Sequence, residues 1–128
     1  MGKKILHIIE TAYRATIEEQ DDPVVWVTQA MRGGGADITV VLRGNAVCYA
    51  TKAQDATGLY FGAWKQTQPP RLQDDVKSMV DRGIKVYVVE DDVAERGLEK
   101  SDLIGGLATL SRAAIPKLVA TFDQISHW

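Results

Sequence analysis

Three short runs of apolar, often β-branched residues place the strongest constraint on how this chain can fold. They are KILHIIE at Lys4–Glu10, DITVVL at Asp37–Leu42 and KVYVVE at Lys85–Glu90. Their apolar residues are nearly continuous, which is typical of strands that are buried on both faces. The runs therefore predict the central strands of a mostly parallel sheet that helices cover on both sides. A weaker run, Leu107–Leu110, predicts a further strand.

Helical patterns fill the segments between these runs. The pair Asp22-Pro23 is a favourable helix start, and Gly33–Gly35 end the helix that follows it. Residues 71–83 carry the clearest amphipathic pattern in the chain. After Pro116, apolar residues recur at helical spacing as far as Ile125, so a last helix is predicted there.

The alternation of strands and helices predicts an α/β fold, a three-layer sandwich with a mostly parallel, flavodoxin-like sheet. The chain has 128 residues, which suits a single domain over residues 1–128. Between the second strand and the helix of residues 71–83, Asn45–Ala53 predicts a short helix and Asp55–Pro70 a long loop. A loop of this length is unusual in a compact domain and favours a functional or interface role.

Composition argues against several classes of function. The net charge of −2 provides no general attraction to nucleic acid or to an anionic membrane. No apolar run approaches the roughly 20 residues of a membrane span, so we expect a cytoplasmic protein. One cysteine and two histidines do not supply a closed set of metal ligands, and no phosphate-binding glycine motif is present. We therefore expect neither a tightly bound metal nor a cofactor.

Ligands of parallel α/β sheets bind beyond the carboxyl ends of the strands. This rule predicts a binding rim made of residues 10–14, 43–48 and 90–92, which follow the first three strands. The arginines of the rim can bind an anion, although isolated arginines are also common as surface charges. The candidate ligand or partner residues of the rim are Tyr13, Arg14, Arg43, Asn45 and Glu90.

Cys48, the only cysteine, follows the second strand and lies near Arg43 in the sequence. A neighbouring cation or a helix N-terminus favours the thiolate, which is the form that persulfide chemistry and nucleophilic attack require. A lone cysteine between Val47 and Tyr49 is more often a small buried hydrophobe. Cys48 is therefore a candidate catalytic residue, and its burial is the alternative.

The acidic run Glu90–Asp92 follows the third strand. Carboxylates suit a hard cation such as Mg²⁺. Asp92 also matches the N-cap of a helix over VAERG, and Asp91 stabilises the same helix end. We favour helix capping over metal binding for this run.

The chain resembles the DsrE/DsrF-like family, which includes sulfur-relay subunits of the Tus and Dsr complexes. The stretches that carry the resemblance are VKSMVDRGIKVYVV at Val76–Val89, ERGL at Glu95–Leu98 and DLIGGLATLSRAAIPKLVATF at Asp102–Phe122. Together with the order of strands and helices, they extend the resemblance over nearly the whole chain. The resemblance implies a role in intracellular sulfur transfer or oxidation, and it implies a homo-oligomer, a trimer or hexamer.

The sequence departs from the family at one important position. Counting back from ERG, the cysteine that accepts persulfide in active members falls at Val89, or by a looser alignment within Glu90–Asp92. None of these residues is cysteine, and valine cannot carry sulfane sulfur. We therefore add Val89 to the rim as a partner-binding position, and the leading hypothesis is a binding or scaffold protein that works beside a thiol carrier.

Two alternative functions stay open from the sequence. The first is a true persulfide carrier that uses Cys48, and the second is a sensor that binds a small molecule or an anion at the rim. The loop segment GLYFGAWK at Gly58–Lys65 supports a homo-oligomer independently, because a monomer rarely exposes a large contiguous apolar patch.

Overall fold

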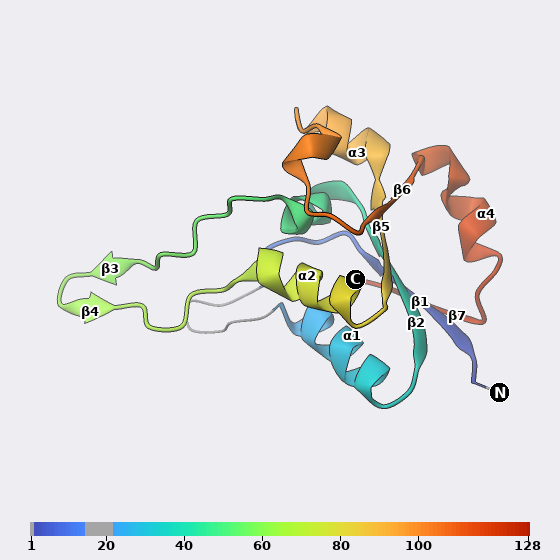
Figure 1. Cartoon of the computed structure of the whole chain (residues 1–128), viewed down its shortest axis with the longest axis horizontal. Coiled ribbons are helices and arrows are strands. Elements are labelled where there is room, and N and C mark those ends of the chain that lie inside the picture. Colours follow the sequence, from blue (N-terminus) through green and yellow to red (C-terminus); the bar gives the residue numbers. More distant parts are fainter. Residues whose placement is uncertain (1, 15–21) are drawn as a thin grey trace.

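A five-stranded parallel sheet forms the centre of the protein, with strand order β6-β5-β2-β1-β7 (Figure 1). The computed structural model describes residues 2–14 and 22–128. The strands are β1 (Lys4–Ile9), β2 (Asp37–Leu42), β5 (Lys85–Val89), β6 (Ala108–Leu110) and β7 (Gln124–His127). The predicted α/β fold is confirmed, and the weak fourth run does form a strand.

Helices cover both faces of the sheet, as the predicted sandwich requires. α1 (Pro23–Gly33) and α2 (Leu72–Asp81) lie on one face, and the short α4 (Ile115–Val119) lies on the other (Figure 1). α3 (Glu90–Glu95) continues directly from the carboxyl end of β5. No helix within the described residues is long and apolar enough to cross a membrane.

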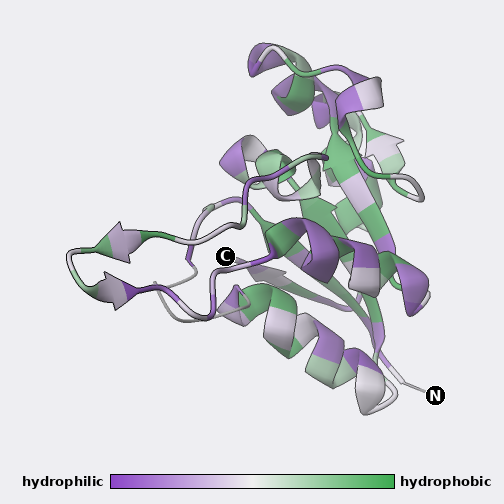
Figure 2. Cartoon of the chain, turned by 60° about the vertical axis from the view of Figure 1, so that its left-hand side comes forward, coloured by the Kyte–Doolittle hydropathy of each residue, from purple (hydrophilic) through white to green (hydrophobic). Residues whose placement is uncertain are grey.

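Neighbouring residues of β1, β2 and β5 enter two separate apolar clusters, which explains the continuous apolar runs. Val40 and Leu42 of β2 belong to the larger cluster beneath α1 and α2, whereas Val41 belongs to the smaller cluster beneath α4. Figure 2 shows the hydrophobic residues gathered in the strands and the hydrophilic residues on the outer sides of the helices.

The start of α1 is built as the sequence predicts. The Asp22 side chain accepts hydrogen bonds from the backbone N–H groups of Val24 (2.8 Å) and Val25 (3.3 Å), while Pro23 occupies the first turn. The segment after β2 forms a 3₁₀ helix, η1 (Gly44–Ala50), where a short helix is predicted. η1 contributes Val47, Tyr49 and other buried side chains to the larger cluster.

The predicted last helix is wrong beyond Val119. The chain leaves α4 there and returns as β7 along the free edge of β1. Asp123 ties this return in place, because its N–H donates to Lys4 O (2.9 Å) and its carboxylate accepts from Lys4 N (2.8 Å). Pairing with a distant strand has therefore overridden the local helical pattern.

The predicted loop Asp55–Pro70 contains a small β-hairpin. β3 (Tyr60–Phe61) pairs antiparallel with β4 (Trp64–Lys65). The turn between them includes Gly62, whose φ of 61° favours glycine. We call residues Gly58–Lys65 the arm, because they extend away from the sheet in both views (Figures 1 and 2).

Candidate functional site

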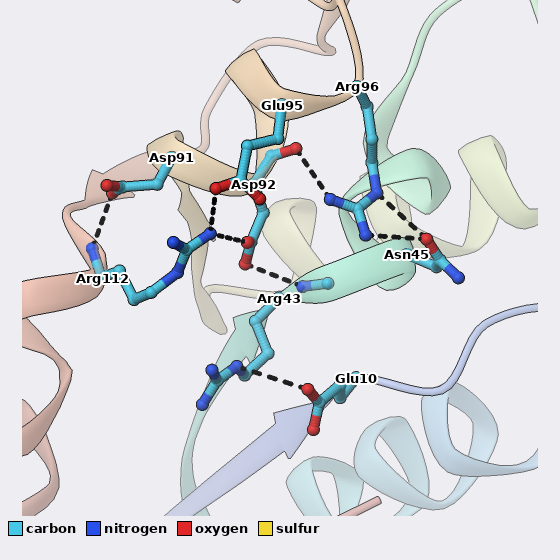
Figure 3. A network of polar contacts seen from close by, with 9 residues as sticks. Glu10, Arg43, Asn45, Asp91, Asp92, Glu95, Arg96 and Arg112 are labelled. Atoms are coloured by element: carbon cyan, nitrogen blue, oxygen red, sulfur yellow. Dashed lines mark hydrogen bonds and ion pairs between the residues drawn. The ribbon is translucent and has the colours of Figure 1, made fainter.

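The carboxyl ends of β2 and β5 are joined by a polar network centred on Asp92 (Figure 3). Gly44 follows β2 with a φ of 55°, and its N–H donates to Asp92 Oδ2 at 2.8 Å. A side chain at Gly44 would place its Cβ only 3.2 Å from Glu10 Cγ. Glycine is therefore favoured here by the backbone conformation and by the close approach of the Glu10 side chain.

Asp92 has a different role from the predicted N-cap. α3 begins at Glu90, so Val89 occupies the N-cap position and Asp92 lies inside the first turn, nearly fully buried. Burial alone would raise the pKa of Asp92, but hydrogen bonds from Gly44 and the Arg112 guanidinium outweigh it and lower the pKa. The carboxylate is therefore a structural bridge between α3, η1 and the segment before α4.

Further contacts surround this bridge. The Arg112 guanidinium also lies 2.8 Å from Glu95 Oε1, and the Arg112 N–H donates to Asp91 Oδ1 at 2.8 Å. Arg96 donates from Nη2 to Asn45 Oδ1 at 2.8 Å and from Nη1 to the Asp92 carbonyl at 3.1 Å. Among the described residues, no group of three or more potential metal ligands is arranged to hold an ion.

Two predicted rim residues are thus engaged in internal contacts. Asn45 accepts from Arg96, and Arg43 Nε lies 3.8 Å from Glu10 Oε1. The other oxygen of Glu10 lies 2.7 Å from His127 Nε2. Arg14 Nη1 and Arg43 Nε are both buried, and neither has a hydrogen-bond acceptor within the described part of the chain.

Cys48 lies in η1, half-buried, on the wall of an open pocket of about 670 Å³. Lys52 and Arg96 bring positive charge to this pocket, and Tyr13 covers part of it. Burial and the neighbouring Cys48 side chain raise the pKa of Tyr13. The phenol is therefore held protonated beside the sulfur, where it can donate a hydrogen bond to a thiolate.

A buried chain of hydrogen bonds through Tyr49 and Asp22, which we call the tyrosine relay, holds the backbone of Tyr13 beside the Cys48 pocket. Tyr13 has a φ of 60°, in the left-handed region that bulky residues rarely adopt. Its N–H and that of Arg14 both donate to the Tyr49 hydroxyl, which donates in turn to Asp22 Oδ2 at 2.6 Å. Burial, followed by the hydrogen bond to Asp22, raises the pKa of Tyr49. Asp22 therefore caps α1 and also positions the tyrosine pair.

Sequence reasoning missed this relay. The sequence marks Tyr49 only as a neighbour of Cys48, and Asp22 only as a helix cap. The tyrosine rings meet edge to face, with centroids 5.7 Å apart, although Tyr13 and Tyr49 are 36 residues apart in the chain. Nothing in the local patterns around Asp22 or Tyr49 indicated that contact.

Val89 and Glu90 lie apart from the Cys48 pocket. Val89 is fully buried in the smaller cluster beneath α4, on the sheet face opposite the cluster against which Cys48 packs. Glu90 is exposed at the mouth of a separate cavity of about 310 Å³ beside α3 and β6. Val89, the first of the positions suggested by the resemblance for an acceptor thiol, is therefore closed, and neither Val89 nor Glu90 shares a pocket with Cys48.

Comparison with known proteins supports the fold. The ychN protein from E. coli aligns with a TM-score of 0.77 at 16% identity, over 98% of this chain and 99% of that chain. BT1422 from Bacteroides thetaiotaomicron, a conserved protein of unknown function, aligns with a TM-score of 0.61 at 14% identity, over 98% and 95% of the two chains. At these identities the likeness establishes the fold alone.

A third structure, MTH1491 from Methanobacterium thermoautotrophicum, also a protein of unknown function, gives a TM-score of 0.60 at 11% identity, over 98% and 99% of the two chains. No protein of curated function matches the sequence significantly. The model of the DsrE/DsrF-like family matches residues 3–125, which is nearly the whole chain. The resemblance predicted from the sequence is thereby confirmed, and the chain belongs to the DsrE/DsrF-like family.

Proposed function

We propose that this protein is a cytoplasmic accessory subunit of sulfur transfer, which binds a thiol carrier but does not itself hold the transferred sulfur. The DsrE/DsrF-like family is associated with intracellular sulfur relay. The observation that carries the proposal is the full burial of Val89, to which the resemblance assigns the acceptor thiol. The looser alternative, Glu90–Asp92, holds no cysteine either. A partner that supplies the thiol then becomes necessary, and the protein supplies a binding surface, as a homo-oligomer.

The Cys48 pocket is the surface that best suits such a partner. A persulfide ionises to carry negative charge on its terminal sulfur, and Lys52 and Arg96 present positive charge to the pocket. Asp102 lies on the same pocket and limits the net charge. The Tyr13 phenol adds a hydrogen-bond donor at the wall.

A second candidate function is persulfide transfer through Cys48 itself, and the presence of Tyr13 and Cys48 on the wall of one pocket favours it. In this reaction the Cys48 thiolate attacks the terminal sulfur of a carrier persulfide. A new S–S bond forms on Cys48, the S–S bond of the carrier breaks, and the carrier leaves as a thiolate. The exchange is redox-neutral and needs no further reactant.

Intact-mass analysis separates the two functions. The wild-type protein and Cys48→Ser are incubated with inorganic polysulfide and, separately, with a persulfidated rhodanese. Under the accessory function, neither gains mass, and both bind the persulfidated protein with equal affinity in calorimetry. A gain of about 32 Da per sulfur on the wild type alone would establish Cys48 as the acceptor and reject the accessory function.

A further inference from the structure

The arm carries an apolar surface that its own chain leaves uncovered. The exposed fractions are 71% for Tyr60, 57% for Leu59, 52% for Phe61 and 43% for Trp64. Within the arm, the rings of Phe61 and Trp64 touch each other, with centroids 5.4 Å apart. A two-stranded hairpin this short is marginally stable in water by itself, and monomers rarely expose a contiguous apolar patch of this kind. A binding partner for the arm is therefore expected.

The body of the same chain has a cavity of matching character. This α3–β6 cavity has a volume of about 310 Å³, and its apolar walls come from Val88, Val93, Leu98 and Leu103. A benzene ring fits an apolar cavity of about 150 Å³, so this one has room for an aromatic side chain with its stem. The arm extends away from α3 in Figure 1 and so does not fill it.

The charges of the two surfaces agree with such a contact. Lys65 is the only charged residue of the arm, and its ammonium lies 5.5 Å from the centre of the Tyr60 ring. Glu90 stands exposed at the cavity mouth and forms no ion pair within the described residues. Lys100 also lines the mouth, so a docked Lys65 would sit on the Glu90 side.

The exposed apolar side chains of the arm are large enough to form much of a stable protein interface. An aromatic side chain buries about 150–250 Å² when it is fully covered. The three aromatic residues of the arm, together with Leu59, therefore supply a large part of the roughly 800 Å² that each partner of a stable interface buries.

We propose that the arm of one copy inserts an aromatic side chain, Phe61 or Trp64, into the α3–β6 cavity of a second copy. The contact joins different surfaces of the two copies, so each copy uses its arm on one neighbour and its cavity on another. Repetition of such a head-to-tail contact builds a ring when the rotation closes. The inference goes beyond the proposed function and stands whether or not the protein takes part in sulfur transfer.

The test uses variants that damage one surface at a time, studied by light scattering after size exclusion at micromolar concentration. Phe61→Ser/Trp64→Ser removes the arm's rings, and Ala94→Phe fills the cavity from α3. Both are expected to convert an oligomer into particles of 14.1 kDa, the mass of one chain. Trp26→Ser is the matched control, because Trp26 is equally exposed, at 60%, but lies on α1, and it should leave the oligomer intact.

Mixing provides the decisive readout. The arm variant keeps an intact cavity, and the cavity variant keeps an intact arm. Each variant alone should be a monomer, but in an equimolar mixture the intact arm of one can enter the intact cavity of the other, so a dimer should form. Thr109→Trp fills the same cavity from β6 and replaces Ala94→Phe if circular dichroism shows that variant to be unfolded. Exchanging the charges, with Lys65→Glu and Glu90→Lys in the same chain, should restore an association that either change alone weakens.

Several results would overturn the proposal. They are a wild type that is a monomer, an oligomer that survives either the arm or the cavity variants, and a mixture that stays monomeric. A monomeric wild type that sediments with vesicles of phosphatidylcholine and phosphatidylglycerol would assign the arm to a lipid surface instead. A monomer whose arm binds only the persulfidated rhodanese would assign it to a carrier protein.

Discussion

Both faces of the central sheet are buried, but among the residues that the structure describes only the face beneath α1 and α2 holds polar side chains in its interior. His7, Thr28, Asp22 and Tyr49 are almost fully buried there, each with a hydrogen-bond partner. The cluster beneath α4 is made of Leu6, Ile8, Val41, Val89 and Ile115, all of them apolar. Burying polar groups is costly and is tolerated when they are paired. The polar face is therefore the one that orients Tyr13 and Cys48, and the apolar face only holds the sheet together.

Among the substitutions considered, Asp22→Ala is expected to lower the free energy of unfolding the most, because it disrupts the polar face. It removes the N-cap of α1 and leaves the buried Tyr49 hydroxyl without its acceptor. Loss of the cap costs about 0.5–2 kcal/mol and the unpaired hydroxyl about 1–3 kcal/mol, so we expect the free energy of unfolding to fall by about 2–4 kcal/mol. Urea unfolding followed by circular dichroism measures the loss.

Asp55→Ala is the control for this experiment. Asp55 also accepts hydrogen bonds two residues along the chain, from Thr57, but it is exposed and has no role in the tyrosine relay. We expect it to change the stability by less than about 0.5 kcal/mol, as surface substitutions usually do. Equal losses for Asp22→Ala and Asp55→Ala would show that the buried relay contributes nothing.

Tyr49→Phe tests the relay without disturbing the helix cap. The change keeps the ring but removes the hydroxyl that binds the N–H groups of Tyr13 and Arg14. We expect a loss of about 1–3 kcal/mol, because a buried carboxylate and a backbone donor lose their partner. Release of Tyr13 should also let Cys48 react faster with a thiol reagent such as a disulfide dye.

Tyr60→Phe is the matched control, since Tyr60 lies exposed on the arm. Neither the stability nor the rate of the thiol reaction should change in that variant. A Tyr49→Phe protein whose Cys48 reacts at the wild-type rate would mean that Tyr13 does not depend on Tyr49 for its position.

Val89→Cys, in a Cys48→Ser background, tests the apolar face directly. Cysteine behaves as a small hydrophobe and nearly preserves the volume, so the loss of stability relative to Cys48→Ser should be below about 1.5 kcal/mol. The new thiol would be buried beneath α4, and we expect polysulfide to load it far more slowly than a thiol of the unfolded chain. Fast loading in the native state, with full loading in urea as the reference, would show that this face opens.

Sequence patterns predicted the features of the two faces that depend only on residues close together in the chain. The bounds of β2 and the cap of α1 follow from apolar runs and from one Asp-Pro pair. β7 was missed, because its residues continue a helical spacing and become a strand only through pairing with β1. The burial of Val89 agrees with its apolar run, but the run does not say which face of the sheet the side chain meets, so its distance from the Cys48 pocket was not predicted. Long-range contacts decided both outcomes.

The smallest expected effect concerns pH and His7. Thr28 donates its hydroxyl proton to Val24 O at 2.7 Å, so His7 Nδ1 must be the donor to Thr28 Oγ1, at 2.9 Å. Burial lowers its pKa below the ordinary value of 6.5. The unfolded chain therefore binds the proton more tightly, and stability should fall as the pH drops below about 6.5, by at most about 1.4 kcal/mol per pH unit.

Urea unfolding at pH 7.5 and at pH 5.5 measures this slope for the wild type and for His7→Phe. His127 is exposed and lies beside Glu10, so its separate contribution is removed by making the same comparison in His127→Gln. The pH dependence should persist in His127→Gln and shrink in His7→Phe. If the pH dependence instead persisted in His7→Phe and shrank in His127→Gln, the titrating group would be on the surface. The buried His7 would then not be the cause of the pH dependence.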